Sequence, residues 1–176
     1  MSKLSFASSR LVNPPGIEPV ITEAQLWAGL QRKVRFPTEF VPAITSCEVI
    51  SDTGTKVRPS FPSRTTHTLT THRGQVVRSV SILGGAAARE EVELHEYTIA
   101  YFDMPETGNR ITNLVSYDEE DRLLLTFSFA GGIPGYDTAA SGAARPSAKE
   151  LNTRIGPAVE HTIQTIRKML VDGKLA

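Results

Sequence analysis

Two opposite charges stand on the apolar faces of neighbouring predicted strands. Arg78 lies on the apolar side of the alternating run 75–83, and Glu90 lies on the apolar side of the run 88–95. The Gly84-Gly85 turn between these runs makes the two positions direct or diagonal neighbours. A buried charge is tolerated when it is paired. Two interpretations are open: a structural ion pair near the rim of a cavity, or a charged handle whose Arg78 stabilises negative charge on a substrate enol, carboxylate or phenol.

An amide stands in the middle of a third apolar face. Asn113 lies on the inward side of the run 109–118, together with Ile111, Val115 and Tyr117. With the turns described below, Asn113 lies opposite Tyr101 on one neighbouring strand and opposite Phe127 on the other. An unpaired buried amide costs roughly 1–3 kcal/mol. Either Tyr101 or a water satisfies Asn113, or this amide holds the carbonyl or hydroxyl of a ligand.

The remaining reactive residues do not form a recognisable site. His67 and His72 are five residues apart and face opposite ways on a strand, which disfavours a shared metal. Cys47, the only cysteine, stands among apolar neighbours and is expected to be a small buried hydrophobe. The chain has no phosphate-binding loop, dinucleotide fingerprint or Gly-x-Ser-x-Gly elbow. We therefore expect no metal and no cofactor.

The composition is that of an ordinary domain. Of its 176 residues 40% are hydrophobic and 22% charged, which excludes a disordered or fibrous chain. Lys plus Arg and Asp plus Glu each number 19, and the net charge of zero argues against a nucleic-acid or anionic-membrane surface. No apolar run approaches the ~20 residues that span a bilayer, and the start, MSKLSFASSR, lacks the apolar block of a signal peptide. The expectation is a soluble cytoplasmic protein.

The elements that position these residues begin with a strand and two helical pieces. Alternation predicts a strand over 4–12, which the prolines of 13–16 end. Thr22 and Gln25 have capping-box spacing and predict a helix over 23–35. A short helical piece over 38–41 is expected between two prolines.

A period of two follows, from residue 45 to residue 130. The links between its runs are too short for parallel crossovers, so we expect successive antiparallel hairpins. The segment 54–74 is an irregular insertion, either a long loop or an irregular strand extension, and 131–146 is a loop rich in glycine and alanine. The expected strands are 45–52, 75–83, 88–95, 97–104, 109–118 and 121–130.

A second capping box, at Ser147 and Glu150, opens a final helix of about 25 residues. Its apolar stripe includes Ile155 and Val159 and continues in register through Gly156-Pro157, so we expect a bend there and no break. The predicted fold class is α+β: a curved seven-stranded antiparallel sheet wrapped around a long C-terminal helix, with two short helices after the first strand. One domain over 1–176 is expected, with a cavity between sheet and helix.

This order of elements, with NPPG at 13–16, LWAGL at 26–30, FVP at 40–42 and MPETG at 104–108, resembles the AtaL-like family of uncharacterised proteins. That family is a branch of the START and birch-pollen-allergen superfamily, which has the helix-grip fold. The resemblance implies a deep hydrophobic ligand cavity. Some members of the family lie in secondary-metabolite gene clusters, and superfamily relatives act as polyketide cyclases. No catalytic residue is carried over, because the family offers no established catalytic motif.

Two functions fit these expectations. The first is a cofactor-independent enzyme, a cyclase, isomerase or pericyclic catalyst, that acts on a hydrophobic polyketide- or terpenoid-like intermediate in secondary metabolism. The alternative is a non-catalytic carrier of a lipophilic small molecule. In either case the protein is expected to be a monomer or weak homodimer. The candidate catalytic residues are Asn113, Arg78, Glu90 and Tyr101. The candidate substrate-binding residues are Phe127, Phe129, Tyr117, Val115, Ile111, Val80, Tyr136, Ile155 and Val159. The loop residues 131–144 are expected to form a gate over the cavity.

Overall fold

The computed structural model of the chain describes residues 4–59, 70–133 and 145–175. Tyr136, His67 and most of the expected gate therefore lie outside the described residues. The strands are β1 (Phe6–Leu11), β2 (Ile44–Pro59), β3 (Thr70–Ile82), β4 (Ala88–His95), β5 (Ile99–Met104), β6 (Asn109–Tyr117) and β7 (Leu123–Ala130). The helices are α1 (Glu23–Arg35), the short 3-10 helix η1 (Pro37–Glu39) and α2 (Ala148–Val171).

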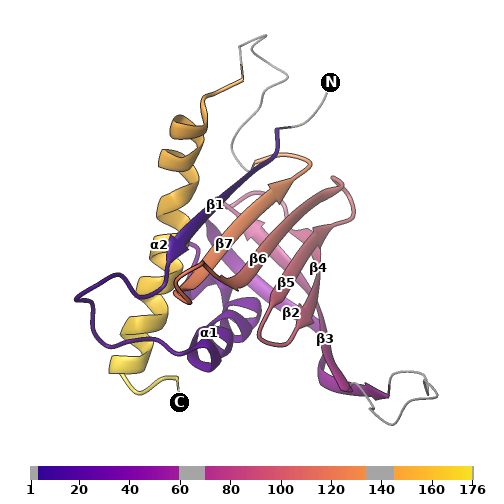
Figure 1. Cartoon of the computed structure of the whole chain (residues 1–176). Helices are drawn as coiled ribbons and strands as arrows, with labels where there is room; N and C mark the ends of the chain where they lie inside the picture. Colours follow the sequence, from indigo (N-terminus) through magenta and orange to yellow (C-terminus); the bar gives the residue numbers. More distant parts are fainter. Residues whose placement is uncertain (1–3, 60–69, 134–144, 176) are drawn as a thin grey trace, which may run out of the picture.

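The seven described strands form one antiparallel sheet in the order β1-β7-β6-β5-β4-β3-β2. Each strand from β2 to β6 pairs with the next one along the chain, while β1 pairs with β7, the last described strand. The sheet curves, and both long helices lie on its concave side, with α2 beside β1 and α1 below the sheet in the view of Figure 1. This arrangement confirms the predicted helix-grip fold.

The segment 54–74 continues the sheet wherever the structure describes it. β2 runs to Pro59 and β3 begins at Thr70, and the two strands stay paired across this stretch. Their register shifts between Asp52 and Thr55, where Gly54 has a φ of 61°. Glycine reaches this left-handed conformation without steric cost. Of the two alternatives for this segment, strand extension is the one found for 54–59 and 70–74, and Figure 1 shows the two strands projecting beyond the rest of the sheet.

Helix α2 begins at the predicted capping box, where Ser147 accepts from the backbone N–H of Glu150 and the Glu150 side chain accepts from that of Ser147. The helix continues through Pro157, as the apolar stripe indicated. A side chain at Gly156 would collide with the guanidinium of Arg10 on β1. Arg10 uses this space to donate to Asn152 on α2 at 3.0 Å. A missing side chain on α2 therefore lets a charged group of β1 tie the helix to the edge of the sheet.

Helix α1 also begins at its predicted capping box, formed by Thr22 and Gln25. Its buried face consists of Leu26, Trp27, Gly29, Leu30, Lys33 and Val34. Gly29 is the point of closest approach to α2, because a Cβ there would overlap the side chain of Ile166, which is fully buried. The absence of a side chain at Gly29 thus sets how deeply α1 packs under α2.

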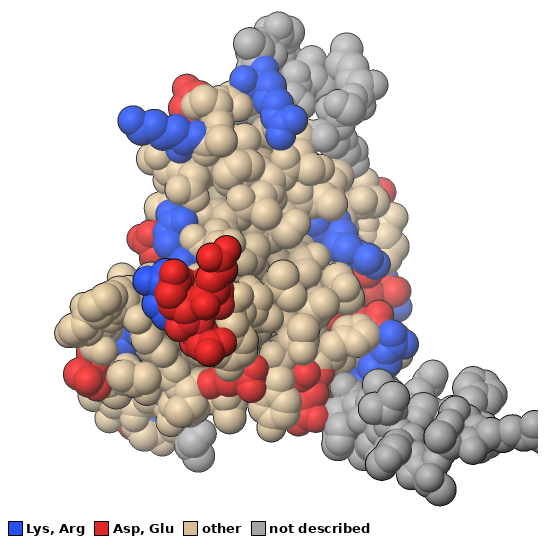
Figure 2. All heavy atoms as spheres, viewed as in Figure 1, with Lys and Arg blue, Asp and Glu red and all other residues tan. Residues whose placement is uncertain are grey.

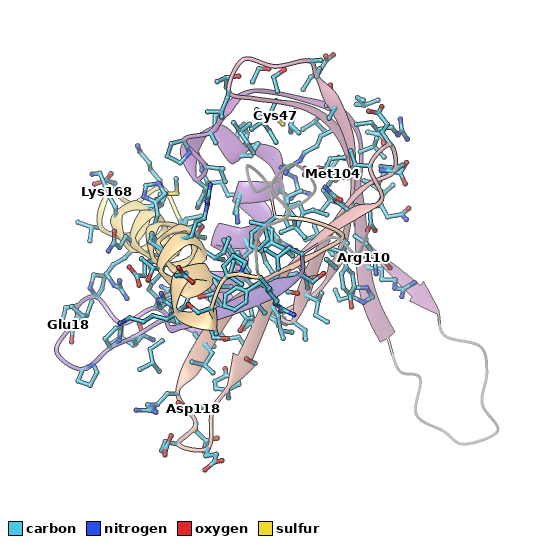
Figure 3. All side chains as sticks on the ribbon, turned by 90° about the horizontal axis from the view of Figure 1, so that it is seen from above. Glu18, Cys47, Met104, Arg110, Asp118 and Lys168 are labelled. Carbon is cyan, nitrogen blue, oxygen red and sulfur yellow. The ribbon has the colours of Figure 1, made fainter. Side chains whose placement is uncertain are left out.

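The surface carries both signs of charge. On the face drawn in Figure 2, Lys and Arg lie interspersed with Asp and Glu, and the densest acidic group covers the turn between β6 and β7. That turn includes Asp118, which Figure 3 places at the tip of a projecting hairpin. Among the described residues, no helix has the length and the apolar character needed to cross a membrane.

Gly29→Ala is expected to lower the free energy of unfolding by about 1–2 kcal/mol, since overpacking against Ile166 outweighs the gain in helix propensity. Urea denaturation measures this loss. In the Ile166→Ala background, Gly29→Ala should leave the free energy of unfolding unchanged or raise it, because the Ile166 side-chain atoms that would collide with the new Cβ are absent. Equal costs of Gly29→Ala in both backgrounds would contradict the packing argument.

Candidate functional site

A cavity of about 240 Å³ lies between the concave face of the sheet and the two helices. Most of its wall is apolar. The described residues that line it come from β2 to β7, both helices and the loops beside them: Lys33, Val41, Ala43, Ile44, Arg78, Val80, Ile82, Glu90, Phe102, Met104, Ile111, Asn113, Phe127, Phe129, Ile133, Ile155 and Ala158. Figure 3 looks down on the curved sheet that encloses this space, with Met104 labelled on β5. Four polar side chains stand out in this wall: Lys33, Arg78, Glu90 and Asn113.

Arg78 and Glu90 form a buried ion pair. They are direct register partners on β3 and β4, as the Gly84-Gly85 turn predicted. The Nε of Arg78 donates to Oε2 of Glu90 at 2.7 Å, and both residues are 3% exposed. In a low-dielectric interior each charge needs the other, because removing one partner leaves an uncompensated ion.

The guanidinium of Arg78 also binds the C-terminal end of α1. Its Nη1 donates to the carbonyl oxygens of Lys33, at 3.2 Å, and Val34. Carbonyls in the last turn of a helix lack partners within the helix, and the helix dipole favours a cation there. Arg78 therefore joins β3, β4 and α1. Of the two interpretations, this geometry favours the structural pair, since the donors of Arg78 are engaged by the protein.

Lys33 is the polar residue of the cavity wall that the sequence interpretation missed. It lies in the last turn of α1, is 6% exposed, and its Nζ donates to Oδ1 of Asn113 at 2.9 Å. The Nζ also stands 3.9 Å from the ring centroid of Phe127. The sequence contains a signal for this burial, because Lys33 follows Leu30 by three residues and Leu26 by seven, on the buried stripe of the helix.

Burial lowers the pKa of Lys33 to about 7, because desolvation disfavours the ammonium form. The positive charge of Arg78 lowers this pKa further, whereas the carboxylate of Glu90 opposes the shift. Near neutral pH the amine therefore exists in both protonation states. This is the property that a general base or a nucleophilic amine requires.

Asn113 is the partner of Lys33, and the NH2 group of its amide has no partner among the described residues. Its side chain is 1% exposed, and its Nδ2 has no hydrogen-bond partner among the described residues. An amine or ammonium donates to the carbonyl oxygen of the amide, so the free group is the N–H donor. A buried amide N–H without a partner is destabilising. A ligand oxygen in the cavity would satisfy it.

The expected partner of Asn113, Tyr101, is in the wrong place, and that prediction is corrected. Asn113 pairs with Ala100, while Tyr101 pairs with Thr112 and faces outward. The guanidinium of Arg110 covers the Tyr101 ring at 4.8 Å. The register of β5 against β6 differs by one residue from the predicted one, and a shift of one residue moves a side chain to the opposite face. The predicted pairing of Asn113 with Phe127 is confirmed.

The expected apolar contacts divide into two groups. The structure places five of them in the cavity wall: Val80, Ile111, Phe127, Phe129 and Ile155. Val115 and Val159 are buried in the hydrophobic core but do not line the cavity. Tyr117 is 50% exposed at the end of β6, because the strand runs past the cavity before it ends. Ile133, from the expected gate, is buried and lines the cavity.

The depressed pKa of Lys33 predicts a pH-dependent stability. Between about pH 7 and the ordinary lysine pKa near 10.4, the unfolded chain binds a proton that the folded chain does not, so stability rises with pH. Relative to Lys33→Met, the parent should gain about 3 kcal/mol in unfolding free energy between about pH 6 and pH 9.5. Urea titrations of both proteins measure the difference. Lys168→Met, at an exposed lysine, is the matched control and should show no such trend; a flat difference for Lys33→Met would contradict the depressed pKa.

The ion pair predicts a second stability effect. Arg78→Met leaves the Glu90 carboxylate buried and the α1 carbonyls without their donor, and should cost about 3–5 kcal/mol. Adding Glu90→Gln should recover only part of this loss. It removes the uncompensated carboxylate, but the contacts between Arg78 and α1 stay broken. The exposed pair Arg89–Glu91 supplies the control, and Arg89→Met should cost under about 1 kcal/mol. Thermal unfolding of the variants tests both values, and equal costs at the two arginines would refute the structural role of Arg78.

Two solved structures resemble this fold. The NMR solution structure of KanY protein matches with a TM-score of 0.54 at 10% identity, covering 96% of this chain and 97% of that one. The crystal structure of Ara h 8.0201 matches with a TM-score of 0.45 at 12% identity, over 96% of this chain and 98% of that one. At such identities the likeness to KanY shows the fold alone. No curated protein matches the sequence.

The family comparison matches the sequence itself over nearly the whole chain. The model of the AtaL family, described as acetylaranotin biosynthesis cluster protein L, matches residues 6–173. This range includes every described strand and helix, and it includes all four polar residues of the cavity wall. The match agrees with the resemblance noted in the sequence. The chain belongs to the AtaL family.

Proposed function

We propose that this protein is a cofactor-independent enzyme of secondary metabolism, a cyclase, isomerase or pericyclic catalyst, whose substrate is a hydrophobic polyketide- or terpenoid-like intermediate held in the cavity. One observation carries the proposal: Lys33 and the free amide nitrogen of Asn113 lie together in a cavity wall that is mostly apolar and whose other two polar side chains, Arg78 and Glu90, are paired. An apolar cavity with a few convergent polar groups is the usual form of a small-molecule site.

Each part of the wall has a task in such a reaction. The aromatic and aliphatic residues exclude water and fix the shape of the substrate, which promotes ring closure by holding the reacting atoms close together. The amide N–H of Asn113 donates to a substrate oxygen and stabilises negative charge that develops on it. Lys33, whose pKa is about 7, can take or give a proton at neutral pH.

Arg78 and Glu90 have a supporting task in this proposal. Arg78 holds the last turn of α1, so it fixes the position of Lys33 against Asn113. Its positive charge also favours the neutral amine of Lys33. We therefore assign the pair to positioning, and we assign contact with the substrate to Lys33 and Asn113.

The family supports the metabolic setting, because its description names a protein of a biosynthesis cluster. The alternative function, a carrier of a lipophilic molecule, is favoured by a different observation. All four polar side chains in the described wall are bonded to each other or to the backbone, and of their described polar atoms the Nδ2 of Asn113 is left without a partner, so a ligand meets few free polar atoms. The two functions differ in whether the bound molecule is changed.

Metabolite profiling of a host that expresses the neighbouring biosynthetic genes tests the proposal. With the parent gene the product should form, and without it an uncyclised or unisomerised precursor should accumulate. Asn113→Leu should lower the rate of conversion by about ten- to a hundredfold, the scale of one lost hydrogen bond. Thr112→Val, on the opposite face of the same strand, is the matched control and should convert normally.

Circular dichroism of Asn113→Leu confirms that any loss is not a loss of fold. A carrier predicts a different outcome: the same product in smaller amount without the gene, and full rescue by Asn113→Leu. That result would overturn the enzyme proposal.

A further inference from the structure

Lys33 and Asn113 present two complementary groups to the same cavity. The Nζ of Lys33 lies 2.9 Å from the Oδ1 of Asn113, so the amide nitrogen of Asn113 is close to the amine as well. That nitrogen has no hydrogen-bond acceptor among the described residues. Both side chains line the cavity. A carbonyl group fits this pair, since its oxygen accepts a hydrogen bond and its carbon is attacked by an amine.

We propose that Lys33 is a nucleophilic amine that forms an imine with a hydrophobic ketone or aldehyde, while Asn113 donates from Nδ2 to the carbonyl oxygen under attack. The inference rests on the proposed function in that the substrate occupies the same cavity. It goes further by naming the substrate class, a carbonyl compound, and the covalent step.

The step balances without a co-reactant. The lone pair of the neutral amine forms a C–N bond, and the carbonyl π pair moves to oxygen, which takes up a proton. The resulting carbinolamine loses its hydroxyl group as water, while nitrogen gives up its remaining proton and forms the C=N bond. Once protonated, the imine withdraws electrons from the adjacent carbon more strongly than the original carbonyl group does. Loss of a proton from that carbon gives the enamine that a ring closure or isomerisation needs.

The surroundings of Lys33 favour the reactive form of its amine. The charged groups that face it are Arg78 on β3 and Glu90 on β4; the former disfavours the ammonium and the latter favours it. Desolvation is the larger influence, and the amine is half neutral near pH 7. Lysines placed in apolar sites react with carbonyl compounds for this reason. The other lysines whose side chains the structure describes, Lys149, Lys168 and Lys174, are exposed and keep water around the ammonium.

Reductive trapping tests the inference. The protein is incubated at neutral pH with cinnamaldehyde and sodium cyanoborohydride, which reduces an imine to a stable secondary amine, and peptide mass spectrometry locates the label. Label should form on Lys33 at least about tenfold faster than on Lys149, Lys168 or Lys174, because an ordinary lysine has only about one neutral amine in a thousand at pH 7. The labelling rate at Lys33 should reach half its maximum near pH 7.

Two variants identify the groups that act. Lys33→Met removes the amine and should leave only the slow labelling of exposed lysines. Asn113→Leu keeps the amine and removes the donor, so labelling of Lys33 should slow by about tenfold, one lost hydrogen bond. Benzoylacetone, a 1,3-diketone, should compete with cinnamaldehyde and form an enaminone with near-ultraviolet absorbance in the parent but not in Lys33→Met.

The results separate the parts of the inference. Labelling of Lys33 no faster than of the exposed lysines would overturn it. Fast labelling that is unchanged in Asn113→Leu would overturn the role of the amide. If trapping fails while metabolite profiling still shows conversion that depends on Asn113, the imine step is wrong and the enzyme proposal stands. If trapping succeeds while profiling shows no conversion, the reactive amine stands and the enzyme proposal fails.

Discussion

The guanidinium of Arg78 connects three elements that are distant in the sequence. It pairs with Glu90 on the neighbouring strand and binds the last carbonyls of α1, so sheet and helix meet at a charged contact inside the protein. Such a contact is stable only with its full set of partners. Its position determines where α1 ends against the sheet, and with it where Lys33 meets Asn113. The chemistry available in the cavity therefore depends on one buried cation, Arg78. The Nη1 of this residue is already engaged by the carbonyls of α1.

The cavity persists because the helices are anchored at its margins. Helix α2 is tied to β1 through Arg10, which occupies the space that Gly156 leaves open. Helix α1 packs on α2 at Gly29, where the contact needs a residue without a side chain. These two glycines allow close approach beside the cavity, while large residues such as Phe102 and Phe129 line it. Close packing at these two glycines holds the helices beside the apolar wall in which the amine and the amide are positioned.

The sequence predicted the elements more reliably than the contacts between them. Both capping boxes, the hairpin order and the pairing of Arg78 with Glu90 follow from local spacing, and each is confirmed. The prediction for Tyr101 was wrong because the position opposite Asn113 depends on the register between the two strands. The sequence does not define the length of the connecting turn, and so it does not determine this register. Lys33 was missed for another reason. Lysine is rarely buried, and the partner of the Lys33 amine, Asn113, lies 80 positions away, where local spacing gives no sign of the contact.

The pairing of β1 with β7 has a consequence for how the protein forms. These strands are separated by more than a hundred residues, and α2, which follows β7, completes the enclosure. Chains emerge from the ribosome with the N-terminal segments first. Strand β1 and helix α1 are therefore synthesised before β7 and α2, against which they pack. Contacts between residues this distant in sequence also slow folding, because the intervening chain loses entropy before the contacts can stabilise the fold. During that interval Lys33 is hydrated and as basic as any surface lysine. Its lowered pKa is therefore acquired late, when the chain closes around it.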